Sequence, residues 1–225
     1  MGKGRGPGKA RGTPARARSG ALRNAARTRA ALVEAAALVI SQHGFEKATL
    51  AVIGRAAGVN PALVGYHFGS KKALYREAVG RPLDELLELV KPLAESQEPA
   101  GKRVAEFVSR FAIVTGKHPV LARHALRESV AGGTLVGKDV RERMSRVFRV
   151  LDGIVRAGMA SGEFAEVLPL AVHMSIVGAL TFYFGSADII DRALDEGALS
   201  RPQVPTPAQF VAHLQKVTLA GLKKK

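Results

Sequence analysis

Residues 49–71 combine small apolar side chains with asparagine, tyrosine, histidine and lysine, a mixture that could read the bases of DNA. Small side chains allow close approach to the major groove, where alanine or leucine can touch a thymine methyl group and asparagine can pair with adenine. Arginine, which commonly reads guanine, is missing from this face. The residues predicted to face outward are Asn60, Pro61, Ala62, Leu63, Gly65 and Tyr66.

The same stretch contains hydrogen-bond donors suited to phosphate oxygens. Lys71 stands at the start of a predicted helix, where backbone amides add positive potential. Such contacts fix the position of a protein on DNA more than its sequence preference. As an isolated pair, Tyr66 and His67 would more simply cover a small core. The predicted phosphate-binding residues are Thr49, Tyr66, His67 and Lys71.

Short helices must position these groups. Apolar residues at spacings of three and four predict an amphipathic helix from Leu22 that ends at Gly44. Thr49 and Asn60 are suited to cap two short helices, 50–56 and 61–68, joined by a turn at Gly58. Three short helices in so little chain predict a helix-turn-helix unit. Its expected core consists of Ile53, Ala57, Val59, Val64 and Phe68.

The rest of the chain also has a helical pattern. Pro82 and Pro92 are expected to kink or interrupt the first of these later helices. No alternating pattern of strands is present, so the predicted fold class is all-α, a helix-turn-helix head followed by a helical bundle. The helices are predicted at about 83–95, 101–116, 119–131, 138–161, 167–186 and 207–222.

Charge is concentrated at the N-terminus. The chain has 34 Lys and Arg against 19 Asp and Glu, a net charge of +15, and nine of the basic residues precede the first acid, Glu34. Residues 1–20, rich in Gly, Pro and Arg, are predicted to be a disordered basic arm that either contacts DNA or only aids solubility. The chain has no cysteine, which excludes disulfides and thiolate catalysis and fits a cytoplasmic location.

The sequence TLAVIGRAAGVNPALVGYHFGSKKALY, from Thr49 to Tyr75, resembles the DNA-binding signature of the TetR/AcrR family. The strings AGVN, YHFGSK and LY carry the resemblance. Gly54 departs from it, because alanine is usual there, and so does Lys72, which replaces an acid. Residues 117–128 also resemble a TetR subgroup related to the CecR regulators.

The resemblance implies a sequence-specific regulator, expected to be a ligand-released repressor that binds an inverted-repeat operator as a homodimer. It implies a DNA-binding domain over 21–80 and a domain for dimerisation and ligand binding over 81–225, with an unknown small-molecule effector. Each candidate ligand residue could equally be ordinary core or helix surface. The candidates are Phe107, Phe111, His118, His124, Arg127, Phe148, Phe182 and Tyr183.

Other types of chemistry are disfavoured by the sequence. His124 and Glu128, four apart on a helix, supply only two metal ligands and are more simply a surface pair. Residues 132–139, GGTLVGKD, approach a Walker A loop, but Asp139 replaces the hydroxyl residue that binds magnesium and a helix precedes the loop. An interhelix turn is expected there, without a cofactor and without enzymatic activity.

Two further alternatives concern partners other than operator DNA. The uncharged run from Val167 to Ala187 is long enough to span a membrane, but it contains Pro169 and His173 and lies within a soluble pattern. A helix packed between its own core and a partner subunit explains the run better. A protein that compacts DNA through the arm alone would show steep salt dependence without sequence preference.

Overall fold

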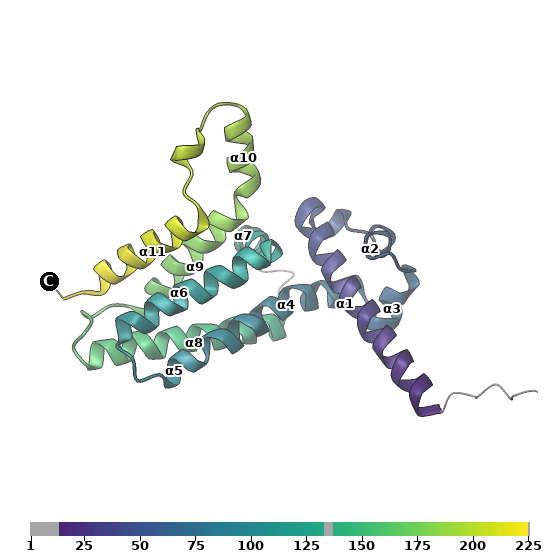
Figure 1. Cartoon of the computed structure of the whole chain (residues 1–225), viewed down its shortest axis with the longest axis horizontal. Helices are drawn as coiled ribbons and strands as arrows, with labels where there is room; N and C mark the ends of the chain where they lie inside the picture. Colours follow the sequence, from purple (N-terminus) through teal and green to yellow (C-terminus); the bar gives the residue numbers. More distant parts are fainter. Residues whose placement is uncertain (1–13, 133–136, 225) are drawn as a thin grey trace, which may run out of the picture.

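The computed structural model describes residues 14–132 and 137–224, and every regular element within them is helical, in agreement with the predicted all-α class (Figure 1). The head contains α1 to α3, and α4 leads from it into the bundle. The helices of the head and connection are α1 Pro14–Lys47, α2 Leu50–Ala57, α3 Ala62–Phe68 and α4 Lys71–Val90. The remaining elements are α5 Pro92–Glu95, α6 Ala100–Lys117, α7 Pro119–Ala131, α8 Lys138–Ala160, α9 Pro169–Gly185, α10 Ala187–Asp195, the 3₁₀ turn Arg201–Gln203 and α11 Pro207–Leu222.

The predicted boundaries of α2 and α3 are confirmed to within one residue, whereas α1 begins at Pro14 and so includes residues 14–20 of the predicted disordered arm. The side chain of Thr49 accepts a hydrogen bond from the backbone N–H of Val52, 3.3 Å away, at the start of α2. Gly58 ends α2 in the left-handed conformation with φ of 67°. The Oδ1 of Asn60 accepts from the N–H of Ala62 at 2.9 Å and begins α3. These local contacts fix the angle between α2 and α3.

The predicted interruption at Pro82 is wrong, because α4 runs from Lys71 to Val90 without a break, whereas the one at Pro92 is confirmed, since a separate helix, α5, begins there. Pro82 is buried inside the helix, and neighbouring Leu83 and Leu86 are also buried. This packing against α6 and α8 offsets the loss of one backbone hydrogen bond. The expected domain boundary at residues 80 and 81 therefore lies inside a single helix, which joins the head to the bundle mechanically.

One helix was missed. The sequence predicts no helix between residues 186 and 207, yet α10 forms over Ala187–Asp195. None of its residues is buried, and it stands away from the bundle in Figure 1. Arg123 of α7 pairs with Asp188 at 2.9 Å and holds its beginning. The missed signal was the repeat of apolar residues at 189, 190, 193 and 194.

The apolar run from Val167 to Ala187 includes α9, which is the helix to test as a membrane span. Over residues 14–132 and 137–224, no single helix has the necessary length and apolarity. Among the helices of the described residues, α9 and α10 meet that test of length and composition only as a pair, and they are bent by 47°.

Candidate DNA interface and effector site

The predicted recognition face lies at the start of α3 and along it, where most of the residues expected to face outward are exposed. Tyr66 has 80% of its surface exposed, and Asn60, Pro61, Ala62 and Gly65 are also exposed. Leu63 differs from the prediction, since it is half-buried and packs against the core. The face available to DNA is therefore made of small residues with one projecting aromatic ring.

The predicted core beneath this face is confirmed. Ile53 of α2 and Val64 of α3 are fully buried, and the other three predicted members, Ala57, Val59 and Phe68, pack against the core while remaining partly exposed. Because these side chains occupy the inner faces of both helices, α3 cannot rotate without disrupting the core.

Gly54, where the resemblance departs from the usual alanine, lies against Pro61. A Cβ atom on Gly54 would lie 2.9 Å from the Cγ atom of Pro61 and 3.0 Å from its Cα and N atoms. Carbon atoms that are not bonded prefer separations of about 3.5–4.0 Å. The glycine therefore allows α2 to approach the beginning of α3 closely, which is a physical reason for the departure.

The residues predicted to bind phosphates differ in their exposure and in the contacts that they already make. Tyr66 projects freely, whereas His67 is half-buried with its ring edge-on to that of Tyr66, the centroids 5.0 Å apart. Lys71 donates through its Nζ to the carbonyl oxygen of Phe45 at 2.9 Å, and this Nζ lies 4.2 Å from the centroid of the Phe45 ring. Lys71 thus anchors the start of α4 to the end of α1, and a phosphate would contact it there.

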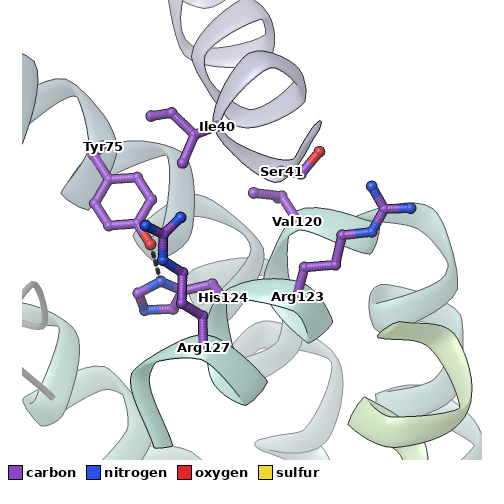
Figure 2. A pocket seen from close by; sticks show the side chains of 7 residues that line it. All are labelled: Ile40, Ser41, Tyr75, Val120, Arg123, His124 and Arg127. Carbon is purple, nitrogen blue, oxygen red and sulfur yellow. Dashed lines mark hydrogen bonds between the residues drawn. The ribbon is translucent and has the colours of Figure 1, made fainter. Parts of the chain in front are cut away.

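The head meets the bundle around Tyr75 of α4 and His124 of α7, whose side chains form a hydrogen bond shown as the dashed line in Figure 2. The Tyr75 ring is buried and also lies 5.2 Å from the Phe45 ring, centroid to centroid. The guanidinium group of Arg127 lies beside this pair and against Gly44 of α1. Residues from α1, α4 and α7 therefore share one junction.

A cavity at this junction has a volume of about 50 Å³ and is too small for an organic effector. A volume of this size suits a water molecule. Two predicted ligand residues, His124 and Arg127, contribute to it, so they connect the head to the bundle instead of lining a large pocket. Its walls are formed by Ile40, Ser41, Tyr75, Val120, Arg123, His124 and Arg127.

Burial keeps the junction pair neutral. Desolvation lowers the pKa of His124 and raises the pKa of Tyr75 well above its usual value. The nearby Glu128 opposes the first shift and adds to the second. His124 and Glu128 are 8% and 5% exposed, so the predicted surface pair is wrong. Within the described parts of the chain, no group of three or more metal-ligating side chains comes together.

Three of the predicted ligand residues gather inside the bundle. Phe107 of α6 and Phe148 of α8 both contact His173 of α9, with ring centroids 6.5 Å and 5.2 Å from that of the imidazole. Phe111 packs beside Phe107 with centroids 6.1 Å apart. Sequence reasoning did not select His173 as a ligand residue, although a single histidine in an otherwise apolar helix was a signal.

One polar atom of His173 is expected to lower the stability of the fold. Its Nδ1 atom is buried and has no hydrogen-bond partner among residues 14–132 and 137–224, and burial lowers its pKa. A buried polar atom without a partner costs about 1–3 kcal/mol of stability. We call Phe107, Phe148 and His173 the aromatic cluster.

The other predicted ligand residues lie elsewhere. The Nε2 of His118 is 2.8 Å from the Oε2 of Glu85, near the surface. Tyr183 stacks on Phe210 at 4.2 Å and donates to the carbonyl oxygen of Pro205. Phe182 is 64% exposed on the outer side of α9. None of these three joins the aromatic cluster.

The lowered pKa values of buried His124 and half-buried His173 lead us to expect that stability depends on pH. Because their folded pKa values are lowered, the unfolded chain binds more protons as the pH falls below about 6.5, and the free energy of unfolding should decline by up to about 1.4 kcal/mol per pH unit for each histidine. Urea unfolding at fixed chain concentration from pH 7.5 to 5.0 measures this decline. His173→Leu should remove part of it, whereas the exposed control His213→Leu should not. A flat profile in the unsubstituted protein would contradict the assignment.

The sequence resembling a Walker A loop is described only at its two ends. Gly132 ends α7 with φ of 71°, and Gly137 precedes α8. Both ends agree with an interhelix turn followed by the start of a helix. Residues 133–136 lie outside the described residues, as do residues 1–13 of the predicted arm.

Family comparisons cover both parts of the chain. Residues 32–78 match the family model for bacterial regulatory proteins of the tetR family. Residues 102–213 match the model for a tetracyclin repressor-like C-terminal domain. The first match contains α2 and α3, and the second contains the aromatic cluster.

Individual relatives agree with these matches. The fatty acid metabolism regulator protein of Bacillus subtilis (strain 168) is 24% identical over 164 residues, 70% of this chain and 78% of that protein. The transcriptional regulator BetI of Rhizobium meliloti (strain 1021) is 39% identical over 74 residues, 31% of this chain and 36% of BetI.

Solved structures share the fold. The fatty acid degradation regulator FadR of Bacillus halodurans has a TM-score of 0.68 at 17% identity, covering 88% of this chain and 97% of that chain. FadR of Bacillus subtilis in complex with stearoyl-CoA has a TM-score of 0.64 at 17% identity, covering 85% and 98%. The predicted CecR-related subgroup is not confirmed by these matches. With both domains matched, the chain belongs to the TetR family of bacterial transcriptional regulators.

Proposed function

We propose that this regulator is a homodimeric repressor that places α3 of each subunit in successive major grooves of an inverted-repeat operator and is released by a small molecule. The observation that carries the proposal is the α3 face, on which small residues surround the projecting Tyr66. In this arrangement Asn60, Ala62 and Gly65 face bases, while Thr49 and Lys71 approach phosphates. Such a repressor acts on DNA in the cytoplasm and catalyses no reaction.

Dimerisation is proposed through α9 and α11. The outer side of α9 exposes Leu170, Met174 and Phe182, which are 54%, 65% and 64% exposed and recur at intervals that place them on one helix face. At Gly178, between them, a Cβ atom would meet no other atom within 4 Å, so this face is open. A symmetric contact with a second copy would cover these apolar side chains.

The proposed effector site is the aromatic cluster between α6, α8 and α9. Phe107 is fully buried, so a ligand would have to displace packed side chains, and a polar ligand atom could satisfy the Nδ1 of His173. The relative that regulates fatty acid metabolism and the FadR complex with stearoyl-CoA support an effector with a long apolar chain.

The proposed transmission path is α4. This helix packs against α6 and α8 of the bundle and carries Tyr75 into the junction with the head. A ligand that separates α6 from α8 would therefore move α4 and change the spacing of the two heads. By linkage, effector and operator must weaken the binding of each other by one common factor.

The proposed function can be tested by selecting bound sequences from random duplex DNA at about 0.15 M salt, where the screening length is roughly 8 Å. We expect enrichment of an inverted repeat, because two related heads bind two half-sites. Binding that depends steeply on salt but enriches no sequence would contradict the proposal and favour the basic arm alone.

Tyr66→Ala should weaken binding to the selected operator by about 1–3 kcal/mol, roughly 5-fold to 150-fold, without dissociating the dimer. The substitution removes an exposed ring and leaves the core beneath α3 intact. Fluorescence anisotropy would measure operator affinity, and sedimentation would measure the oligomeric state. Leu38→Ala is a matched control, because Leu38 is 54% exposed on α1. Equal affinities for Y66A and L38A would refute the contact.

A further inference from the structure

A second hollow lies between the head and the bundle, on a surface separate from the junction cavity. It has a volume of about 470 Å³ and is bordered by α1, α4 and α8. Four guanidinium groups converge on it, from one residue of α1, two of α4 and one of α8. These residues are Arg29, Arg76, Arg81 and Arg143.

Two of the four arginines are neutralised by carboxylates in the hollow. Arg29 forms a two-pronged ion pair with Glu77. The Nε of Arg143 is 2.7 Å from an oxygen of Asp84, and its guanidinium also lies 3.4 Å from Asp139. These pairs tie α1 to α4 and α4 to α8, and they orient the walls of the hollow.

The other two arginines lack such partners. Neither Arg76 nor Arg81 forms an ion pair with a carboxylate among residues 14–132 and 137–224. The Nε of Arg76 is buried and has no hydrogen-bond partner within the same residues. Burying a guanidinium nitrogen without an acceptor is costly, so this nitrogen marks an incomplete interaction.

The side chain of Arg76 packs against the backbone of Gly137. A Cβ atom at residue 137 would lie 2.6 Å from the Nε of Arg76 and 2.8 Å from its Cζ, so only glycine leaves room for the guanidinium in this position. The start of α8 follows directly, and its dipole adds positive potential on the same side of the hollow. The same Cβ atom would lie 2.5 Å from the Oδ1 of Asp139, so a carboxylate lies near Arg76 but forms no ion pair with it among the described residues.

We propose that this hollow binds a phosphate-bearing anion through Arg76 and Arg81. Arginine presents a planar fork of donors that matches phosphate oxygens. The four arginines outnumber the three carboxylates that border the hollow, Glu77, Asp84 and Asp139, so its net positive charge favours an anion. The volume exceeds that of one phosphate and suits a phosphorylated small molecule. The site is distinct from the aromatic cluster, and its existence does not depend on the proposed function.

Free inorganic phosphate and the phosphate of a larger organic molecule share this chemistry. Both would contact α4 and the start of α8 at once. Because α4 also belongs to the unit that carries α3, occupancy would bridge the head and the bundle. Operator DNA is a less suitable occupant, since α8 belongs to the bundle and closes one side of the hollow.

Calorimetric titration of the full chain with inorganic pyrophosphate, without DNA and at constant ionic strength, tests the site. We expect saturable binding that Arg76→Met and Arg81→Met each weaken about tenfold or more, since each removes a charge-assisted contact. Arg149→Met, an exposed residue farther along α8, is the charge-matched control and should change the affinity less than twofold. Thermal unfolding would verify that each variant is folded.

Gly137→Ala provides a variant that keeps every charge. Its Cβ atom would displace the Arg76 guanidinium, and we expect pyrophosphate binding to weaken at least fivefold.

Titration with adenosine 3′,5′-bisphosphate distinguishes a free inorganic anion from a phosphorylated organic molecule. Tighter binding than pyrophosphate, with the same sensitivity to R81M, would indicate an organic ligand, and equal or weaker binding would indicate the free anion.

Three outcomes would overturn the inference. The first is the absence of saturable pyrophosphate binding, in which case the arginines serve only as structural ion-pair groups. The second is an equal loss of affinity in R149M, which would indicate attraction to net charge. The third is competition between operator and pyrophosphate together with weaker operator binding by R81M, which would identify Arg81 as a contact of the DNA backbone. Because the titration contains no DNA, failure of the repressor proposal would leave its result unaffected.

Discussion

Gly54→Ala should weaken operator binding by at least tenfold, about 1.4 kcal/mol, although alanine is the better helix former. The added methyl group would meet the ring and backbone of Pro61 at 2.9–3.0 Å. Neither part of Pro61 can move independently of α3, so the beginning of α3 must shift. Overpacking of this kind costs about 1–3 kcal/mol, which exceeds the gain of about 1 kcal/mol in helix propensity.

Operator anisotropy and urea unfolding together measure this effect. Gly153→Ala is the matched control, because a Cβ atom at this exposed position of α8 meets nothing within 4 Å. We expect G153A to be neutral or stabilising by up to about 1 kcal/mol, with unchanged operator affinity. If G54A bound the operator as tightly as G153A, the close approach of α2 to α3 would not control the position of the recognition face.

The head was predictable because its signals are local. Thr49, Gly58 and Asn60 determine helix ends through contacts with residues two to four positions away, and their types alone indicate these roles. The apolar spacing of the first three helices also identified the core beneath α3. Leu63 was misplaced because a seven-residue helix has too few turns to separate its faces clearly.

The junction and the hollow bordered by Arg76 and Arg81 were not predictable, because they depend on contacts between distant residues. Tyr75 and His124 are 49 positions apart, and Arg143 and Asp84 are 59 apart. No periodicity links such residues, and Tyr75 was singled out only as the last residue of the family signature. Pro82 was equally misleading, since tertiary packing holds α4 together where local propensity predicts a break.

The fold brings together only some of the candidate ligand residues that were chosen by residue type. Phe107, Phe111 and Phe148 meet in the bundle, whereas Phe182 faces outward. Residue type identifies side chains that can bind apolar ligands, but it does not distinguish the inner from the outer face of α9, a helix that is apolar nearly all round. The contacts of His173 with Phe107 and Phe148 identify the inner face.

Gly44→Ala should destabilise the protein by about 3 kcal/mol and alter the contact between the head and the bundle. Gly44 has φ of 80° and ψ of 163°, a region that is essentially restricted to glycine, and non-glycine residues there cost about 1–3 kcal/mol. The new Cβ atom would also lie 2.5 Å from the Nη1 of Arg127. This end of Arg127 can move away, so backbone strain should dominate the loss of stability, while the displaced guanidinium should disturb the junction.

Arg127→Ala separates the two effects, because it removes the guanidinium without straining α1. Arg127 is an exposed residue although its guanidinium contacts the junction, so we expect R127A alone to cost less than about 1 kcal/mol. In the double variant, the cost of G44A should persist nearly in full, as strain at Gly44 does not require Arg127. Urea unfolding of the four proteins at one chain concentration measures these values. If R127A abolished most of the cost of G44A, the junction contact and not the backbone conformation would determine why glycine ends the predicted helix at this position.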